Sequence, residues 1–210
     1  MVDLVVFYDD ALYTKNDWRN RNLIKTKEGL KWLTIPVETS GRITNKRKIN
    51  ETKCINARWK VKHWNTIYNN YVHAKYFDYY SENFKLLYTS CIENYLSEIN
   101  KYFIMAICDI LGIVTKIRDS SEFSLHGGQT TKLVNICKEL NATDYYTGPA
   151  ARNYLNEDEF IKNNINVHYF DYSNYPEYPQ LFTPFRHDVT IMDLLFNTGP
   201  NFKNYLKNSL

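Results

Sequence analysis

Residues 113–148 read "IVTKIRDSSEFSLHGGQTTKLVNICKELNATDYYTG" and contain three secondary-structure patterns in succession. Residues 113–123 are typical of a strand, and residues 143–148 are typical of a second, shorter strand. Between them, apolar side chains recur at helical spacing in residues 130–142, which predicts an amphipathic helix. The succession of strand, helix and strand favours an α/β fold with a mainly parallel sheet.

The same alternation extends to both ends of the chain. Residues 2–8, "VDLVVFY", form a nearly continuous apolar run that is typical of a strand buried on both faces. Further strand candidates are residues 31–37 and 166–172. From residue 57 to residue 111 the apolar period is helical, which predicts two or three long helices closed by Gly112 as a C-cap. We therefore expect a single α/β domain over residues 1–210, with its mainly parallel sheet flanked by helices and a helical insertion around residues 57–111.

The amino-acid composition is rich in aromatic residues. Phe, Trp and Tyr make up 16% of the 210 residues, and 18 of them are Tyr. Tyr and Trp bury apolar area but keep a polar tip, so this composition fits either an aromatic core or a polar cleft lined with rings. Composition alone does not separate these two interpretations.

Charge and cysteine usage exclude several classes of protein. The chain has 26 basic and 23 acidic residues, a near balance that argues against a nucleic-acid-binding surface. Its one dense basic run, residues 42–48, is more typical of a solvated loop than of a phosphate site. The sequence contains neither a signal peptide nor an apolar stretch of ~18 residues, so we expect a cytoplasmic protein without a transmembrane segment. Four scattered cysteines predict no disulfide, and we expect no metal and no cofactor.

A polar segment follows the first strand. Asp9 and Asp10 end that strand, at the position where ligands bind in open α/β sheets. Paired carboxylates can orient an amine or a hydroxyl, and guanidinium groups suit phosphate or carboxylate. The polar and aromatic candidates that follow are Lys15, Trp18, Arg19, Arg21 and Asn22. We predict that this segment forms the rim of a pocket for a charged small molecule; the alternative is an Asp–Arg network that only holds a loop in place.

Two further segments place a glycine just before a predicted helix. Gly128 and Gly148 precede helix N-termini, where free N–H groups suit an anion such as the diphosphate of a nucleotide sugar. Tyr154 is a polar contact available beside the second glycine. The sequence has neither a P-loop nor a GxGxxG motif, so ordinary glycine-containing caps explain these segments equally well.

Lys62 and His63 lie near the start of the first predicted helix of the insertion. Successive helical residues point about 100° apart, so the two side chains need not face the same ligand. His63 is a candidate general base, although the sequence identifies no partner for it.

Several stretches together resemble the WbqC-like family. "YDDALYTKNDWRNRNLIKT" and "KWLTIPV" are similar to its Asp-Asp-x-x-Tyr, Trp/Tyr-x-Asn-Arg-Asn and Trp-Leu-Thr-Val-Pro-Val elements. The resemblance continues in order through "WKVKHWNTIYNNYVHAKYFDYY", "LGIVTKIRDSSEF", "KLVNICKELNATDYYTGPAARNYLNEDEF" and "YPQLFTPFRHDVTIMDLLFNTGP". Family members usually begin with a His-Gln-Pro segment, which we expect this chain to lack, together with any catalytic His that the segment supplies.

The resemblance implies a role in bacterial surface-polysaccharide biosynthesis, for O-antigen or capsule. It implies an enzyme, a transferase that places an amino acid such as glycine, or an acyl group, on a nucleotide-linked or lipid-linked sugar. The alternative is a non-catalytic accessory protein that associates with other glycan-biosynthesis enzymes.

Site residues follow from the resemblance and from the polar segments together. The catalytic candidates are Asp9, Asp10 and His63. The substrate-binding candidates are Lys15, Trp18, Arg19, Arg21, Asn22, Lys62, Ser121, Gly128, Gly148, Tyr154 and Gln180. Asp193 also matches the family pattern, but it lies in an apolar predicted helix, where a buried carboxylate must be paired, so we expect a structural brace.

Overall fold

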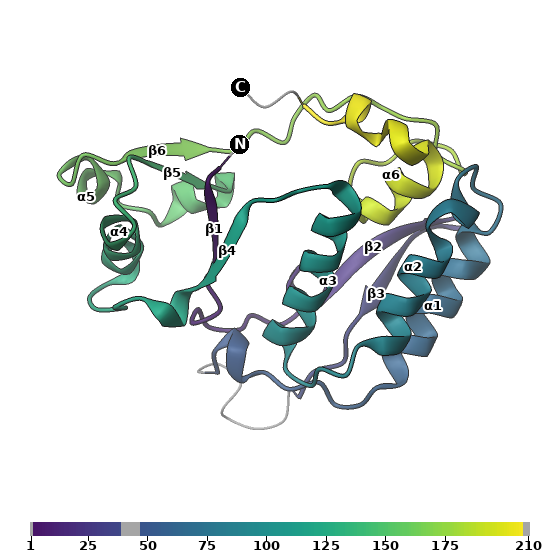
Figure 1. Cartoon of the computed structure of the whole chain (residues 1–210), viewed down its shortest axis with the longest axis horizontal. Helices are drawn as coiled ribbons and strands as arrows, with labels where there is room; N and C mark the ends of the chain where they lie inside the picture. Colours follow the sequence, from purple (N-terminus) through teal and green to yellow (C-terminus); the bar gives the residue numbers. More distant parts are fainter. Residues whose placement is uncertain (1, 39–46, 208–210) are drawn as a thin grey trace. The chain divides into compact units, whose positions relative to one another are not determined.

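The computed structural model describes residues 2–38 and 47–207. The chain folds as two compact units, each assembled from separate parts of the sequence (Figure 1). Unit 1 comprises Met1–Asp10 and Val114–Asn174, and unit 2 comprises Ala11–Ile113 and Tyr175–Leu210. The single domain expected over residues 1–210 stays a prediction.

Unit 1 contains two parallel strand pairs with helices between their strands. β1 (Leu4–Phe7) pairs with β4 (Lys116–Asp119), and β5 (Asp144–Thr147) pairs with β6 (Asn166–Tyr169). The helices are η3 (Ser120–Glu122), α4 (Gln129–Glu139), η4 (Pro149–Asn153) and α5 (Glu157–Ile161). Val134, Cys137, Phe160 and Ile165 form the buried cluster that joins α4 and α5 to the chain entering β6. The apolar side chains on one face of α4 are therefore buried, as the helical spacing of apolar residues predicts.

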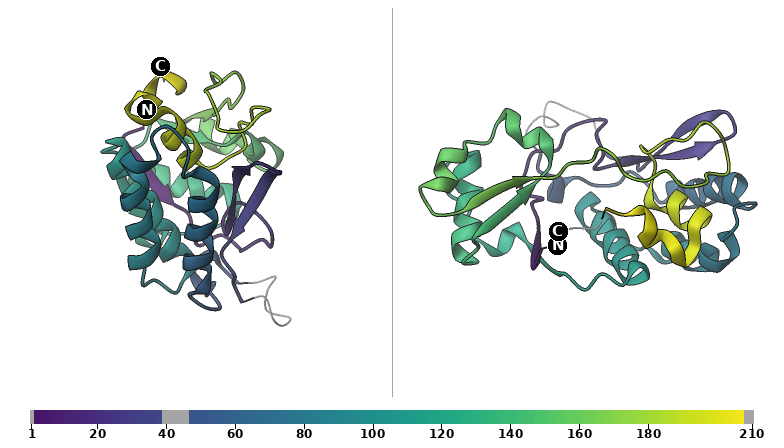
Figure 2. Two further views of the ribbon diagram at one scale, coloured as in Figure 1. Left: turned by 90° about the vertical axis from the view of Figure 1, so that its right-hand side faces the viewer. Right: turned by 90° about the horizontal axis from the view of Figure 1, so that it is seen from above.

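Unit 2 is built on an antiparallel hairpin. β2 (Arg21–Thr26) pairs with β3 (Gly29–Thr34), and Gly29 has a φ of 117° in the tight turn, a conformation that suits glycine. Figures 1 and 2 show three helices along one face of this hairpin: α1 (Arg58–Tyr71), α2 (Phe77–Ser90) and α3 (Leu96–Leu111). The remaining elements are η2 (Ile49–Glu51), α6 (Ile191–Thr198) and η5 (Gly199–Tyr205). Gly112 ends α3 in the left-handed conformation, with a φ of 69°.

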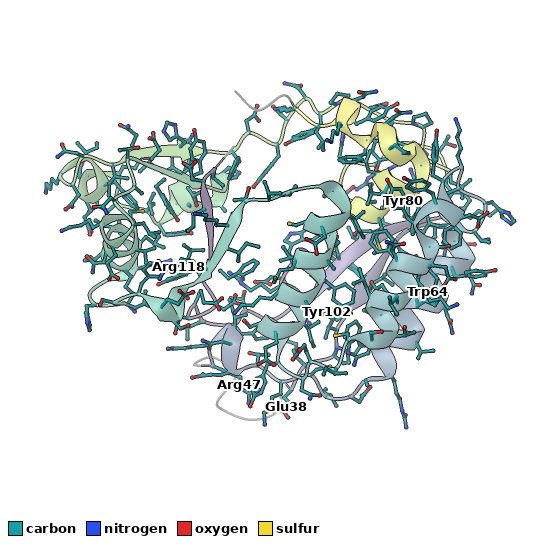
Figure 3. The ribbon with its side chains drawn as sticks, viewed as in Figure 1. Glu38, Arg47, Trp64, Tyr80, Tyr102 and Arg118 are labelled. Atoms are coloured by element: carbon teal, nitrogen blue, oxygen red, sulfur yellow. The ribbon has the colours of Figure 1, made fainter. Side chains whose placement is uncertain are left out.

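Aromatic rings dominate the core of unit 2. Tyr71, Phe84 and Phe196 are fully buried, and the rings of Phe77 and Phe196 lie 5.1 Å apart. Trp64 stacks on Phe77 at 6.2 Å, and Figure 3 labels it on α1. Much of the aromatic content is therefore used for packing, in edge-to-face and offset contacts that add to the burial of area.

The α/β class is confirmed, and two of the three described strand pairs are parallel. The predicted helices between residues 57 and 111 are three in number. One difference concerns residues 21–26, which sequence analysis placed in the polar segment after the first strand and which form β2. Leu23 and Ile24 are buried at the centre of that strand, so a short apolar pair is enough to fix it against the helices.

The basic run falls largely outside the described residues, since 42–46 are not described. Arg47, at its edge, forms an ion pair with Glu38 at 3.5 Å; both are labelled in Figure 3. Within residues 2–38 and 47–207, no helix combines the length and the apolar character needed to cross a membrane.

Candidate functional site

A cavity of about 650 Å³ lies in unit 2, between the hairpin β2–β3 and the helices that cover it. Its wall comes from the segment before β2, from both strands, from α1, α2 and α3, and from the start of α6. Five of the predicted site residues line it: Trp18, Arg19, Arg21, Asn22 and His63. The structure thus brings together residues that are far apart in sequence.

The outer end of the cavity is aromatic and positively charged. Trp18 is 61% exposed, and its ring lies 5.1 Å from that of Trp32. The guanidinium carbon of Arg21 lies over the Trp32 ring at 4.1 Å, which is a cation–π contact. The exposed indole of Trp18, close to the guanidinium of Arg21, suits the face of a sugar or a base that carries an anionic group.

The segment before β2 is held in place by its own polar contacts. Arg19 pairs with Asp17 and donates to Oγ1 of Thr14 at 2.9 Å. The Asn100 side chain on α3 donates to the Arg19 carbonyl at 2.9 Å, and Arg21 donates through Nη2 to the Asn16 carbonyl. An Asp–Arg network therefore holds this segment, but its carboxylate is Asp17 and not the predicted Asp9 or Asp10. The residues that it fixes also line the cavity.

The inner end of the cavity is an aromatic cluster. The Trp59 ring lies 5.2 Å from His63 and 6.1 Å from Tyr88, and Tyr88 lies 4.9 Å from Phe103. Trp59, His63 and Tyr88 are each at most 6% exposed, in contrast to Trp18 at the outer end. The aromatic side chains are therefore exposed at the mouth of the cavity and buried at its inner end.

His63 is uncharged at neutral pH. Burial lowers its pKa from 6.5 to about 4, against the opposing effect of the Thr34 carbonyl. Its Nε2 lies 3.0 Å from that carbonyl oxygen, which can only accept, so Nε2 carries the proton and Nδ1 keeps a lone pair. As a result, His63 offers a hydrogen-bond acceptor rather than a charge.

Three polar atoms of cavity-lining residues have no hydrogen-bond partner within the described part of the chain. They are Oδ1 of Asn20, Nε of Arg21 and Nε1 of Trp59, and all three are buried. Buried polar groups are normally paired, so unpaired ones at a cavity indicate that a ligand or water completes them. Sequence analysis interpreted residue 59 as part of an apolar helical stripe and did not single out Asn20, although Asn20 lies between the two predicted arginines.

A second polar arrangement lies at the carboxyl ends of β1 and β4 in unit 1. Ser120 is 2% exposed and donates from Oγ to Oδ2 of Asp10 at 2.9 Å. The predicted Ser121, one position later, is exposed. Burial raises the pKa of the Tyr145 phenol on β5. Tyr8, just after β1, is close enough to add a smaller contribution in the same direction. Sequence analysis missed the contact of Ser120 with Asp10. The apolar pattern of a four-residue strand does not predict which of the two serines that follow it points inward.

The other predicted residues of unit 1 lie at the ends of its short elements. Gly128 is the N-cap of α4, Gly148 precedes η4, and Tyr154 follows η4 and is 52% exposed. Asp9 follows β1 and is half-buried. These residues belong to unit 1 and the cavity belongs to unit 2, so their convergence on one ligand stays a prediction.

Lys15 and Lys62 are exposed and do not line the cavity. On α1, Lys62 faces outward while His63 is buried, as expected for neighbours about 100° apart on a helix. Gln180 instead joins a buried polar network. It accepts from Nζ of Lys25 at 3.0 Å and donates to Oδ1 of Asp193 at 3.0 Å.

Asp193 is the centre of that network and is 1% exposed. Tyr71 and Tyr178 donate to its two oxygens at 2.7 and 2.8 Å. Burial raises the pKa of Asp193, and the hydrogen bonds from the two phenols and Gln180 oppose this effect. The carboxylate is paired, as predicted for a buried Asp. Across residues 2–38 and 47–207, no group of three or more His, Cys, Asp or Glu side chains is arranged to hold a metal ion.

Comparison with known proteins places the whole chain in one family. The sequence matches the WbqC-like protein family over residues 1–205. It is 41% identical over 206 residues to "Uncharacterized protein Rv1507c" of Mycobacterium tuberculosis, covering 98% of this chain and 88% of that protein. No solved structure gives a significant match. The chain belongs to the WbqC-like protein family.

Proposed function

We propose that this protein acts in bacterial surface-polysaccharide biosynthesis, in the cytoplasm, as a transferase. It places an amino acid such as glycine, or an acyl group, on a nucleotide-linked or lipid-linked sugar. Family membership supports the pathway, and the cavity of unit 2 supports the class of substrate.

The observation that carries the proposal is the polarised cavity. Its volume of about 650 Å³ falls within the range of small-molecule sites, roughly 300–1,000 Å³. Arg19 and Arg21 at its mouth outnumber the single carboxylate, Asp17, so the mouth favours an anionic group such as a phosphate. Trp18 adds an exposed ring on which a sugar or a base can stack.

Binding is tested by thermal shift with a panel of UDP-linked and dTDP-linked amino sugars. A ligand at 100 times its dissociation constant adds ~2.7 kcal/mol to the free energy of unfolding. We expect a shift for the wild type and its loss in Arg21→Ala. The control is Arg58→Ala, which removes an exposed arginine of α1 outside the cavity and should keep the shift. No shift with any nucleotide sugar would contradict the nucleotide-linked form of the proposal.

Turnover separates the transferase from the accessory protein that is its alternative. The protein is incubated with a bound sugar and an activated amino-acid or acyl donor, and the sugar is analysed by mass spectrometry. A gain of one glycyl or acyl group supports the transferase, and binding without any gain supports the accessory role.

Asp10 is the residue of unit 1 that we assign to the chemistry, to orient the acceptor amine or hydroxyl. Its contact with the buried Ser120 fixes one carboxylate oxygen, Oδ2. Asp10→Asn should abolish turnover and leave the protein folded. Full turnover of this variant would remove Asp10 from the mechanism.

A further inference from the structure

Two residues that line the cavity combine deep burial with an unpaired polar atom. The indole N–H of Trp59 and Oδ1 of Asn20 have no partner among the residues that the structure describes. The two side chains are only 4% and 5% exposed. One atom is a donor and the other an acceptor, so a ligand that satisfies both must carry an acceptor and a donor of its own.

Part of the wall of the same cavity is apolar and uncharged. Ile24, Leu33 and Met192 line the cavity and are at most 8% exposed. Such a wall stabilises a small apolar group by removing it from water. Together, the inner end matches a group with an acceptor, a donor and a methyl or short alkyl substituent.

Other common substituents of sugars and amino acids fit less well. A carboxylate satisfies the Trp59 N–H but places a second acceptor against Oδ1 of Asn20. An ammonium group has no acceptor for Trp59 and lies in a cavity whose mouth carries Arg19 and Arg21. A hydroxyl satisfies both atoms but leaves the apolar wall without contact. A secondary amide with a short acyl chain meets all three conditions.

We propose that the inner end of the cavity recognises the N-acyl amide of an acylated amino sugar. The Trp59 indole donates to the amide oxygen, Asn20 accepts from the amide N–H, and the acyl methyl group packs against Ile24, Leu33 and Met192. This inference rests on the proposed function, which supplies the sugar, and it names the substituent by which the sugar is selected.

The test uses glycosides without a phosphate, so that it does not depend on phosphate binding at the mouth. Methyl glycosides of N-acetylglucosamine and N-acetylgalactosamine are compared with the corresponding hydroxyl and free-amine glycosides by calorimetric titration of the 210-residue chain. We expect the better N-acetyl glycoside to bind at least about tenfold more tightly than its hydroxyl and amine counterparts, as expected for two hydrogen bonds and a buried methyl group. Equal affinities across each set would overturn the inference.

Trp59→Phe removes the indole N–H and keeps an aromatic ring. It should weaken binding of the N-acetyl glycoside about tenfold, the effect of one hydrogen bond to a buried group. Trp64→Phe is the matched control, because Trp64 is on the same helix, packs on Phe77 and does not line the cavity. Unchanged affinity in a folded Trp59→Phe variant would also overturn the inference. If that variant does not fold, the comparison of glycosides with the wild type decides alone.

The two proposals fail separately. If nucleotide sugars give no thermal shift but the N-acetyl glycosides bind through Trp59, the proposed carrier is wrong and the amide site stands. If nucleotide sugars bind through Arg21 but N-acetyl and free forms bind equally, the amide site is wrong and the proposed function stands.

Discussion

The phenol of Tyr71 donates a 2.7 Å hydrogen bond to Oδ2 of Asp193 across 122 positions of sequence. The same phenol oxygen accepts the backbone N–H of Lys25 at 3.0 Å. One hydroxyl group therefore connects α1, α6 and β2 inside unit 2. The Asp193 carboxylate also accepts from Tyr178, so its loss leaves the hydroxyl groups of Tyr71 and Tyr178 without their acceptor.

Asp193→Ala should lower the free energy of unfolding by about 3 kcal/mol, the usual cost of breaking a buried, charged hydrogen-bond network. Urea denaturation measures the change. Asp188→Ala is the control, since Asp188 is an exposed carboxylate paired with Arg186 at 2.7 Å and should change stability by less than about 1 kcal/mol. Equal effects of the two substitutions would mean that the network contributes little.

His63 should make the stability of the protein depend on pH. Its folded pKa of about 4 lies below the ordinary value of 6.5, so the unfolded chain binds more protons between these two pH values. The free energy of unfolding should therefore fall as the pH drops from 6.5 to 4, by up to roughly 3 kcal/mol in total. His63→Gln, which keeps a donor for the Thr34 carbonyl, should show a weaker fall in denaturation series at pH 7 and pH 4.5.

The raised pKa of Asp193 acts in the opposite direction. Its folded form binds more protons than its unfolded form, so its contribution to stability falls as the pH rises above 3.8. Comparing wild type with His63→Gln at each pH cancels this contribution. Identical pH profiles for the two proteins would show that His63 titrates normally in the fold.

Trp18→Ala should weaken binding of a nucleotide sugar by about tenfold or more and leave stability nearly unchanged. Trp18 is largely exposed and contacts mainly the Trp32 ring, so it stabilises the free protein little. Tyr79→Ala is the control, because Tyr79 is 64% exposed on α2 and does not line the cavity. Titration calorimetry and thermal denaturation measure the two effects. A loss of stability without a loss of affinity would assign Trp18 to packing.

Ser120→Ala should lower the free energy of unfolding by about 1–2 kcal/mol, because it removes the buried hydroxyl that donates to Oδ2 of Asp10. Ser121→Ala changes the same residue type one position later, on an exposed side chain, and should have no measurable effect. Chemical denaturation of both variants provides the comparison. If Ser121→Ala proved the more destabilising of the two, the hydrogen bond from Ser120 to Asp10 would contribute little to stability.

Local patterns predicted much of this fold. The helical period after residue 57 and Gly112 as the cap of α3 are confirmed, since both depend on neighbours a few positions apart. The strand β2 was missed because its apolar pair, Leu23 and Ile24, is too short to stand out among polar residues. Its burial depends on helices that lie far along the chain.

The candidate site divides in the same way. The polar character of Trp18, Arg19 and Arg21 was visible in the sequence, and these residues line one cavity. The unpaired indole N–H of Trp59 was not visible in the sequence, because a Trp at helical spacing cannot be distinguished from any other core residue until its neighbours are known. Pairing of polar atoms is a property of tertiary structure, and no periodicity encodes it.

The interleaved boundaries of the two units have a consequence for biosynthesis of the polypeptide. β1 finds its partner only when Lys116 has left the ribosome, and unit 2 is complete only after the C-terminal segment that carries α6 has emerged. The nascent chain therefore carries an unpaired strand and an unfinished aromatic core through most of translation, a situation in which chaperones are commonly engaged. For the same reason, no contiguous expression fragment contains one whole unit without part of the other.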